Sequence, residues 1–147
     1  MRFVFAIKRW RQARCLSYNV AMRLEHFALQ VPEPVAMADW YVNHLGATVA
    51  RAGGAPQHGR FLKVGGVLFE IYNNPAVSMP DYSAIKVMQL HLAFSSENLK
   101  ADRDRLVKAG ARVIEDVSTT PAGDEIMMLR DPWNVPIQFV KRKEPMM

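Results

Sequence analysis

The chain has 147 residues, half of them hydrophobic, which is enough to bury one compact core or two small fused modules. Its formal charge of +5 arises in residues 1–21, which hold five basic residues and no acidic one, so the charge gives little reason to expect nucleic-acid binding. No apolar run is long enough to span a membrane, and a single cysteine, Cys15, excludes an internal disulfide. We therefore expect a cytoplasmic protein that binds neither nucleic acid nor membrane.

Residues 1–21 form a basic N-terminal extension with three open interpretations. The apolar run Phe3–Ile7 precedes the positive charges, which is the reverse of a secretory signal. The Arg-containing, acid-poor composition fits an organelle-targeting segment or a basic surface helix, and Met22 is an alternative natural start.

The first half of the remaining chain predicts a strand, a helix and three strands. Alternating apolar residues indicate a strand at Leu24–Val31, and Pro32-Glu33-Pro34 is typical of the first turn of a helix. The helix has an apolar face made of Met37, Trp40, Tyr41, His44 and Leu45. Three strands are then expected, at 47–51, at His58–Val64 and at Val67–Tyr72, the last two joined by a Gly65-Gly66 hairpin turn.

The second half predicts the same order of elements. Asn73–Lys86 is rich in turn residues and is expected to be a loop. A strand at Val87–Ser95 is followed by a helix that Ser96 caps and that runs to Ala109. The last strands are expected at Arg112–Val117, Asp124–Arg130 and Val135–Arg142, the final two separated by a turn at 131–134.

The two halves look like a duplication. His26 and His91 each lie in an alternating apolar run, and Gly46 and Gly110 each follow a helical pattern, at an offset of about 65 residues. We therefore predict an α+β fold of two βαβββ modules that form a curved, mostly antiparallel sheet cup with helices on the outside. Module one spans 22–73, a linker 74–86, module two 87–142 and a tail 143–147.

Four polar residues occupy matching places in the two modules. Glu70 lies between Phe69 and Ile71 on the last strand of module one, and Gln138 lies between apolar neighbours on the last strand of module two. Because strand side chains alternate between faces, both polar groups point away from the core, as do His26 and His91. If the four converge, two imidazoles and two oxygen donors suit a divalent metal such as zinc, nickel, iron or manganese.

These features resemble the vicinal oxygen chelate superfamily, which includes glyoxalase I, extradiol dioxygenases, methylmalonyl-CoA epimerase, fosfomycin-resistance enzymes and bleomycin-resistance proteins. The resemblance covers residues 22–142, and the segment 130–138 is similar to the family ending Asp-Pro-x-Gly-Asn-x-Pro-Ile-Glu. It implies a divalent metal ion (zinc, nickel, iron, manganese or cobalt) bound by His26, Glu70, His91 and Gln138, the last replacing a glutamate of many members. It also implies a homodimer, although in this superfamily two modules can close a cup within one chain or across two.

The resemblance favours a glyoxalase-like lyase or isomerase that acts on a small substrate chelating the metal through two oxygens. The epimerase resembles the ligand order His, Gln, His, Glu, and exchanging the halves gives the order seen here, with Glu70 as the remaining carboxylate and catalytic base. Tyr72, Asn74 and Arg60 are the expected substrate-binding residues. Dioxygenase chemistry ranks lower because extradiol dioxygenases are longer and place their carboxylate where Gln138 stands.

Other interpretations remain open. The main alternative is a metal-free small-molecule-binding protein, similar to bleomycin-resistance proteins, in which the same positions line a pocket. Glu70 would also be satisfied by an ion pair with Arg60 or Arg130. His44 and His58 are expected at the surface, while Trp40 and Tyr41 are expected in the core.

Overall fold

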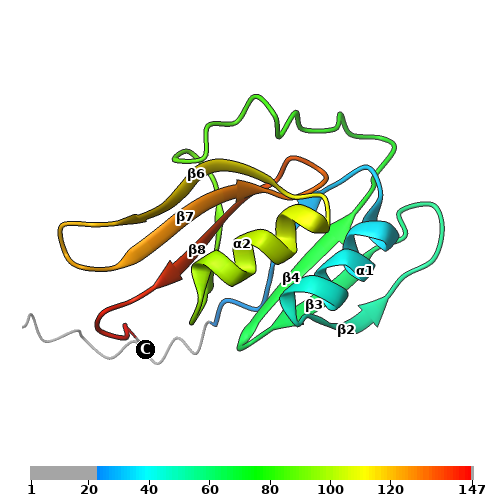
Figure 1. Cartoon of the computed structure of the whole chain (residues 1–147). Helices are drawn as coiled ribbons and strands as arrows, with labels where there is room; N and C mark the ends of the chain where they lie inside the picture. Colours follow the sequence, from blue (N-terminus) through cyan, green and yellow to red (C-terminus); the bar gives the residue numbers. More distant parts are fainter. Residues whose placement is uncertain (1–22, 147) are drawn as a thin grey trace, which may run out of the picture.

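The computed structural model describes residues 23–146, so the interpretations of residues 1–21 lie outside the described residues. The first module contains one helix and four strands, as predicted (Figure 1). In chain order they are β1 (Phe27–Gln30), α1 (Pro34–Leu45), β2 (Thr48–Ala52), β3 (Arg60–Val64) and β4 (Val67–Tyr72).

The second module repeats this arrangement, which confirms the predicted pair of βαβββ units. It contains β5 (Leu92–Ser95), α2 (Leu99–Lys108), β6 (Arg112–Thr119), β7 (Glu125–Arg130) and β8 (Pro136–Lys141). The two sheets have the same strand order, β1-β4-β3-β2 and β5-β8-β7-β6, each with one parallel and two antiparallel pairings. In the described part of the chain no strand of one sheet pairs with a strand of the other.

The hairpin prediction and the helix-end prediction are both confirmed in module one. Val64 pairs with Val67 across Gly65-Gly66, and Gly46 ends α1 with φ 68°. This left-handed conformation is accessible to glycine without a steric penalty, and the Gly46 N–H donates to the Tyr41 carbonyl.

Both histidine-bearing strands are shorter than predicted. β1 begins at Phe27 and β5 at Leu92, so each histidine lies immediately before its strand. Before β5 the chain turns instead, because the Gln89 N–H donates to the Lys86 carbonyl and the Gln89 side chain accepts from the Lys86 N–H.

The predicted N-cap of the second helix is also wrong by two residues. Asn98 caps α2, since its side chain accepts a hydrogen bond from the Ala101 N–H. Ser96 lies two residues earlier, where its hydroxyl donates to Asp102 and accepts from the Asn98 N–H.

The two modules share one hydrophobic core. In Figure 1 each helix lies against the sheet of its own module, α1 against β3 and β4 and α2 beside β6–β8, and residues from both modules form a single buried cluster. Tyr41 of α1 is fully buried and its ring contacts Phe69 of β4 and Phe94 of β5. Four side-chain hydrogen bonds also cross between the described parts of the modules, from Trp40 to the Ala109 carbonyl, from Arg105 to the His44 carbonyl, from Tyr41 to Asp131 and from Trp133 to Glu33.

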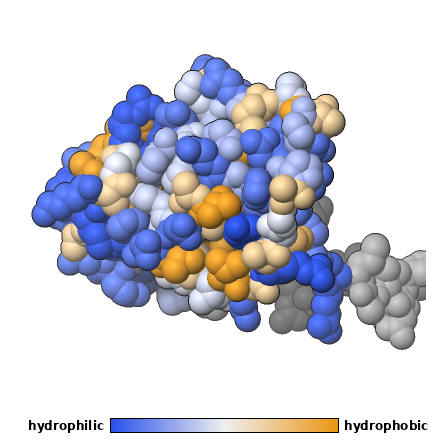
Figure 2. All heavy atoms as spheres, turned by 90° about the vertical axis from the view of Figure 1, so that its right-hand side faces the viewer, coloured by the Kyte–Doolittle hydropathy of each residue, from blue (hydrophilic) through white to orange (hydrophobic). Residues whose placement is uncertain are grey.

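The surface offers no sign of a membrane-spanning element. Among the described residues no helix has the length and apolar character needed to cross a bilayer. The face that includes α1 and β2 is mostly hydrophilic, with a small hydrophobic group near its centre (Figure 2).

A buried carboxylate fixes the contact between the modules. Asp131 begins the turn before β8 and is only 3% exposed. One oxygen accepts from the Tyr41 hydroxyl at 2.9 Å, and the other accepts from the N–H groups of Trp133 and Val135. Burial nevertheless raises the pKa of Asp131 to about 6, which outweighs the opposite effect of these hydrogen bonds.

We expect Tyr41→Phe to destabilise the protein by about 1–3 kcal/mol, because it leaves a buried Asp131 oxygen without its partner. Chemical denaturation measures this. Tyr72→Phe is the matched control, since the Tyr72 hydroxyl makes no hydrogen bond among the described residues, and it should change stability by less than about 0.5 kcal/mol. Equal effects of the two substitutions would contradict the role of the Tyr41 hydroxyl.

The raised pKa of Asp131 predicts a specific dependence of stability on pH. A carboxyl whose folded-state pKa lies above its unfolded value stabilises the protein below the unfolded pKa, and this contribution is lost as pH rises through the folded pKa. The stability difference between wild type and Asp131→Asn should therefore fall by about 2 kcal/mol between about pH 4 and pH 7.

The exposed Asp81 provides a control, because its contribution to stability should change with pH in the opposite direction. A hydrogen bond from Ser83 lowers the pKa of Asp81, so its contribution is present at neutral pH and is lost on acidification. The difference between wild type and Asp81→Asn should rise with pH below about pH 4 and stay nearly constant between about pH 4 and pH 7. Parallel trends for the two variants, measured by urea denaturation across this range, would refute the assignment for Asp131.

Candidate functional site: two matching half-sites

Two of the four predicted ligands, His26 and Glu70, lie next to each other on the first sheet. Ala28 of β1 pairs with Glu70 of β4, and His26 lies two residues before Ala28, so the imidazole and the carboxylate share a face. His26 Nε2 lies 3.7 Å from Glu70 Oε2, and both side chains are half-buried. Two ligands that each lie about 2.0–2.2 Å from one ion can have this separation.

The other two predicted ligands, His91 and Gln138, occupy the equivalent positions on the second sheet. Ala93 of β5 pairs with Gln138 of β8, and His91 lies two residues before Ala93. The structure therefore brings His26 together with Glu70, and it places His91 and Gln138 on the other sheet. Within residues 23–146 no three His, Cys, Asp or Glu side chains lie close enough together to hold a metal ion.

His26 and His91 both contact an oxygen through the same ring nitrogen, Nδ1. His26 Nδ1 contacts the carboxylate of Glu25, and His91 Nδ1 donates to the Val87 carbonyl at 2.8 Å. An oxygen acceptor at Nδ1 holds the proton there and leaves the Nε2 lone pair available, which is the arrangement that metal-ligating histidines use.

A cavity of about 530 Å³ adjoins Glu70 on the first sheet. Tyr72 and Asn74, two of the predicted substrate-binding residues, line it. Tyr72 is half-buried, while the Asn74 side chain accepts a hydrogen bond from the Ala76 N–H. The cavity therefore combines a carboxylate, an aromatic ring and an amide within one module.

Arg60, the third predicted substrate-binding residue, lies elsewhere. It pairs with Ile71, so it occupies the face opposite Glu70. Its guanidinium donates to the carbonyls of Gly53, His58 and Gly59 at 2.8–3.1 Å. Arg60 thus holds together the loop that borders the cavity.

Neither arginine that was considered as an ion-pair partner reaches Glu70. Arg130 is buried and donates to the carbonyls of Tyr82, Ile85 and Asn134. Among the described residues, the basic side chain that lies beside the Glu70 carboxylate is His26, with Nε2 3.7 Å from Oε2. His58 is exposed, whereas His44 is half-buried against Trp40.

Sequence reasoning missed two residues that line the cavity. Phe61 is paired with Glu70 across β3 and β4, and its ring meets the His26 ring edge-on at a centroid distance of 5.2 Å. Arg51 pairs with Phe61 and brings a cation to the same face. The two-residue hairpin turn at Gly65-Gly66 already fixes the pairing of Phe61 with Glu70 and would have identified it.

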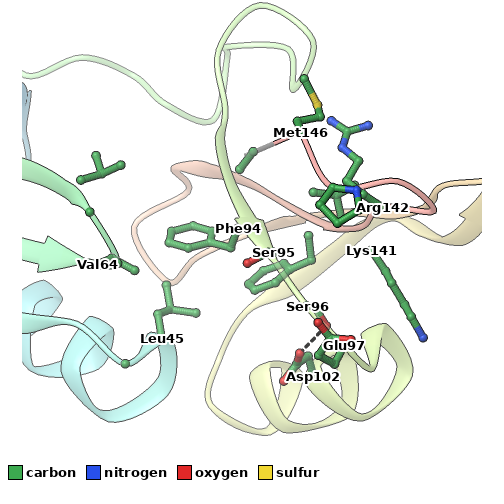
Figure 3. A pocket seen from close by; sticks show the side chains of 18 of the residues that line it. Leu45, Val64, Phe94, Ser95, Ser96, Glu97, Asp102, Lys141, Arg142 and Met146 are labelled. Atoms are coloured by element: carbon green, nitrogen blue, oxygen red, sulfur yellow. Dashed lines mark hydrogen bonds between the residues drawn. The ribbon is translucent and has the colours of Figure 1, made fainter. Parts of the chain in front are cut away.

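A second cavity, of about 860 Å³, lies between the modules (Figure 3). Leu45, Val64 and Phe94 form apolar parts of its wall, and Ser96 donates to Asp102 at 2.6 Å at its floor. Burial alone would raise the pKa of Asp102. The hydrogen bonds from Ser96 and Arg105 have a larger combined effect in the opposite direction, so the pKa of Asp102 is lowered overall. None of the four predicted metal ligands lines this cavity.

The fold and the half-sites define a class of protein, in which paired βαβββ modules carry a histidine and an oxygen-bearing side chain at matching strand positions. The model of the Glyoxalase/Bleomycin resistance protein/Dioxygenase superfamily matches residues 23–139, and the chain belongs to this superfamily.

Individual relatives agree with this assignment. The ethylmalonyl-CoA/methylmalonyl-CoA epimerase of Cereibacter sphaeroides is 32% identical over 99 residues, which cover 63% of this chain and 74% of the epimerase. A glyoxalase/bleomycin resistance protein/dioxygenase family enzyme from Burkholderia phytofirmans superposes with a TM-score of 0.67 at 18% identity, covering 81% of this chain and 98% of that one. A fosfomycin resistance protein from Listeria monocytogenes gives a TM-score of 0.63 at 15% identity, covering 86% and 95%. The two solved structures show the shared fold.

We predict that Arg60→Met loosens the loop at residues 53–59. The Gly53 N–H donates to the Gly59 carbonyl, and its hydrogen exchange should accelerate at least about tenfold, since a hydrogen bond to a charged group contributes about 1.5–3 kcal/mol. Lys63→Met, an exposed position on the same strand, is the control and should leave this amide unchanged. Equal exchange rates in both variants would show that the guanidinium does not hold the loop.

Proposed function

We propose that this chain is a divalent-metal-dependent enzyme of isomerase or lyase type, which acts on a small substrate that presents two oxygens to the metal. The observation that carries the proposal is the pairing of His26 with Glu70, together with the equivalent positions of His91 and Gln138 on the second sheet. A cytoplasmic setting is part of the proposal.

The donor set fits a borderline divalent ion. His26, Glu70, His91 and Gln138 would supply two imidazoles, one carboxylate and one amide oxygen, and each imidazole already keeps Nε2 available. When bound, the ion would act as a Lewis acid and stabilise negative charge on the substrate oxygens. Because Gln138 is uncharged, this set has one negative charge fewer than a set with two carboxylates.

Within this set Glu70 is the residue suited to move a proton. Its carboxylate can take a proton from the carbon next to a carbonyl, so that the C–H bond breaks and the electron pair remains in an enolate-like substrate. Delivery of a proton from water or another acid to the opposite face of that carbon gives the epimer. Gln138 cannot take this role, because an amide is not a base at neutral pH.

The epimerase relative supports isomerase chemistry as the first activity to test. It is 32% identical over 99 residues, and epimerisation needs one base beside an acidic C–H group, which Glu70 provides. The half-buried rings of Phe61 and Tyr72 support a second candidate, in which the cavity holds an aromatic ligand without metal. Binding that is unchanged by a chelator would favour this second function.

Metal content provides the direct test of the proposal. Protein purified without chelator and loaded with zinc, nickel, cobalt or manganese should retain a stoichiometric ion, measured by elemental analysis. His26→Ala and His91→Ala should each lose most of it, because removing a ligand lowers affinity strongly. His58→Ala, at an exposed histidine outside the half-sites, is the matched control and should retain wild-type metal content.

Glu70→Gln separates proton transfer from metal binding. The amide oxygen can still act as a ligand, whereas exchange of the α-proton of methylmalonyl-CoA with D₂O should slow by about 10²–10⁴-fold, since this is the usual contribution of a general base. The measurement is NMR of the metal-loaded protein. Wild-type exchange in Glu70→Gln would remove Glu70 as the base, and absence of both metal and exchange in the wild type would remove the proposed function.

A further inference from the structure

A β-bulge in β2 turns Arg51 onto the face of the first sheet that borders the 530 Å³ cavity. Val49 and Arg51 pair with consecutive residues of β3, so Ala50 is the extra residue between them. In a regular strand Ala50 would stand opposite Phe61, and Arg51 would share the face of Val49, away from the cavity. The bulge therefore brings an arginine to the cavity, and bulges beside functional sites commonly redirect a side chain in this way.

The second module contains the same bulge, but the residue that it turns is acidic. Val113 and Glu115 pair with consecutive residues of β7, and Ile114 is the extra residue between them. Glu115 thus occupies the position that Arg51 occupies in the first module. The two modules share the bulge and differ in the charge, so the fold does not demand a cation here. The cation belongs specifically to the half that holds Glu70.

The guanidinium of Arg51 has no carboxylate partner within residues 23–146. It lines the same cavity as Glu70, yet the ion pairs of the described residues do not include it. The nearby Arg60 differs, because its guanidinium donates to three loop carbonyls. A planar guanidinium with five donors matches the geometry of a carboxylate or a phosphate. Arg51 is therefore equipped to bind an anionic group inside the cavity.

Gly59 leaves room beside the Glu70 carboxylate. A Cβ at Gly59 would lie 3.6 Å from Glu70 Oε1 and 3.9 Å from the Cβ of Tyr72. A larger side chain at this position would fill the space next to the carboxylate. The loop at residues 53–59 thus borders Glu70 and leaves its side chain 26% exposed.

Arg51 and Glu70 stand two strands apart, with Phe61 between them. Arg51 pairs with Phe61, and Phe61 pairs with Glu70, which places the two outer backbones about 10 Å apart at the usual strand spacing. All three residues line the cavity. A ligand that reaches both ends needs a negative group at Arg51 and a short chain that passes the aromatic ring.

We propose that Arg51 binds an oxyanion of the substrate, either a carboxylate or a phosphate, and so makes the cavity selective for small acids. This inference names the substrate class of the proposed function and rests on it for the role of Glu70. The reacting end of the substrate lies at Glu70, and an additional negative group lies at Arg51. An analogue of the same length without that group loses the ionic contact.

A matched pair of acids tests this selectivity. 2-Oxoglutarate and 2-oxopentanoate share the same keto-acid end, and the first has a terminal carboxylate where the second has a methyl group. Zinc-loaded wild type should bind 2-oxoglutarate about three- to tenfold more tightly, measured by NMR titration at about 0.15 M salt. The range reflects a bidentate contact at an exposed arginine, which contributes less than a buried one. 4-Phosphono-2-oxobutanoate in the same titration distinguishes the two anions, since the tighter binder identifies the group that Arg51 prefers.

Substitutions of Arg51 locate the selectivity. Arg51→Met should bind both keto acids alike, whereas Arg51→Lys, which retains the charge without the planar fork, should keep part of the preference. Lys63→Met is the matched control, because Lys63 is an exposed cation of β3 that does not line the cavity. It should bind both acids as wild type does. A preference that survives in Arg51→Met, or that disappears in Lys63→Met, would overturn the proposal.

Substitutions of Gly59 test whether the acid binds inside the cavity. Gly59→Val would occupy the space beside Glu70, so both keto acids should bind more weakly although Arg51 is intact. Gly59→Ala adds only a Cβ at ordinary contact distances and should have a smaller effect. Wild-type affinity for 2-oxoglutarate in Gly59→Val would place the acid outside the cavity and contradict the proposal.

The same titrations without zinc separate this inference from the proposed function. An Arg51-dependent preference for 2-oxoglutarate, in a wild type that retains no metal, would support the anion site and remove the metal-dependent function. A zinc-loaded wild type that binds both keto acids equally would overturn the anion site and leave the proposed metal chemistry intact.

Discussion

The buried carboxylate of Asp131 joins the two modules at the centre of their contact. It accepts the Tyr41 hydroxyl of α1 with one oxygen and two N–H groups of its own turn with the other. This turn leads directly into β8, so the same residue that fastens module one to module two also sets the start of the strand that carries Gln138. The raised pKa of Asp131 shows that burial outweighs its hydrogen bonds.

The shared core and the separated half-sites are two consequences of the same packing. Strand side chains alternate, so once Phe69 and Phe139 face the common core, Glu70 and Gln138 must face away from it. A one-residue shift in either sheet would bury Glu70 or Gln138 and expose the aromatic ring. Core packing therefore protects the register on which each half-site depends.

Much of this arrangement could be predicted from local patterns. Alternation placed Glu70 correctly on the non-core face, and the repeated order of elements predicted both modules. The first residues of β1 and β5 were harder to predict. Before β5, His91 follows a turn that Gln89 stabilises, and the contacts of Gln89 depend on neighbours that a periodic pattern does not reveal. Contacts between the modules, such as Tyr41 with Asp131, link residues far apart in sequence and leave no local pattern that would predict them.

The duplicated half-sites differ in one chemical respect that matters for reactivity. Each supplies an imidazole with Nδ1 held by an oxygen, but Glu70 brings a charge and Gln138 does not. The proposed four-ligand site, with one half of each kind, would hold a single carboxylate, which would have to serve both as a ligand and as a base.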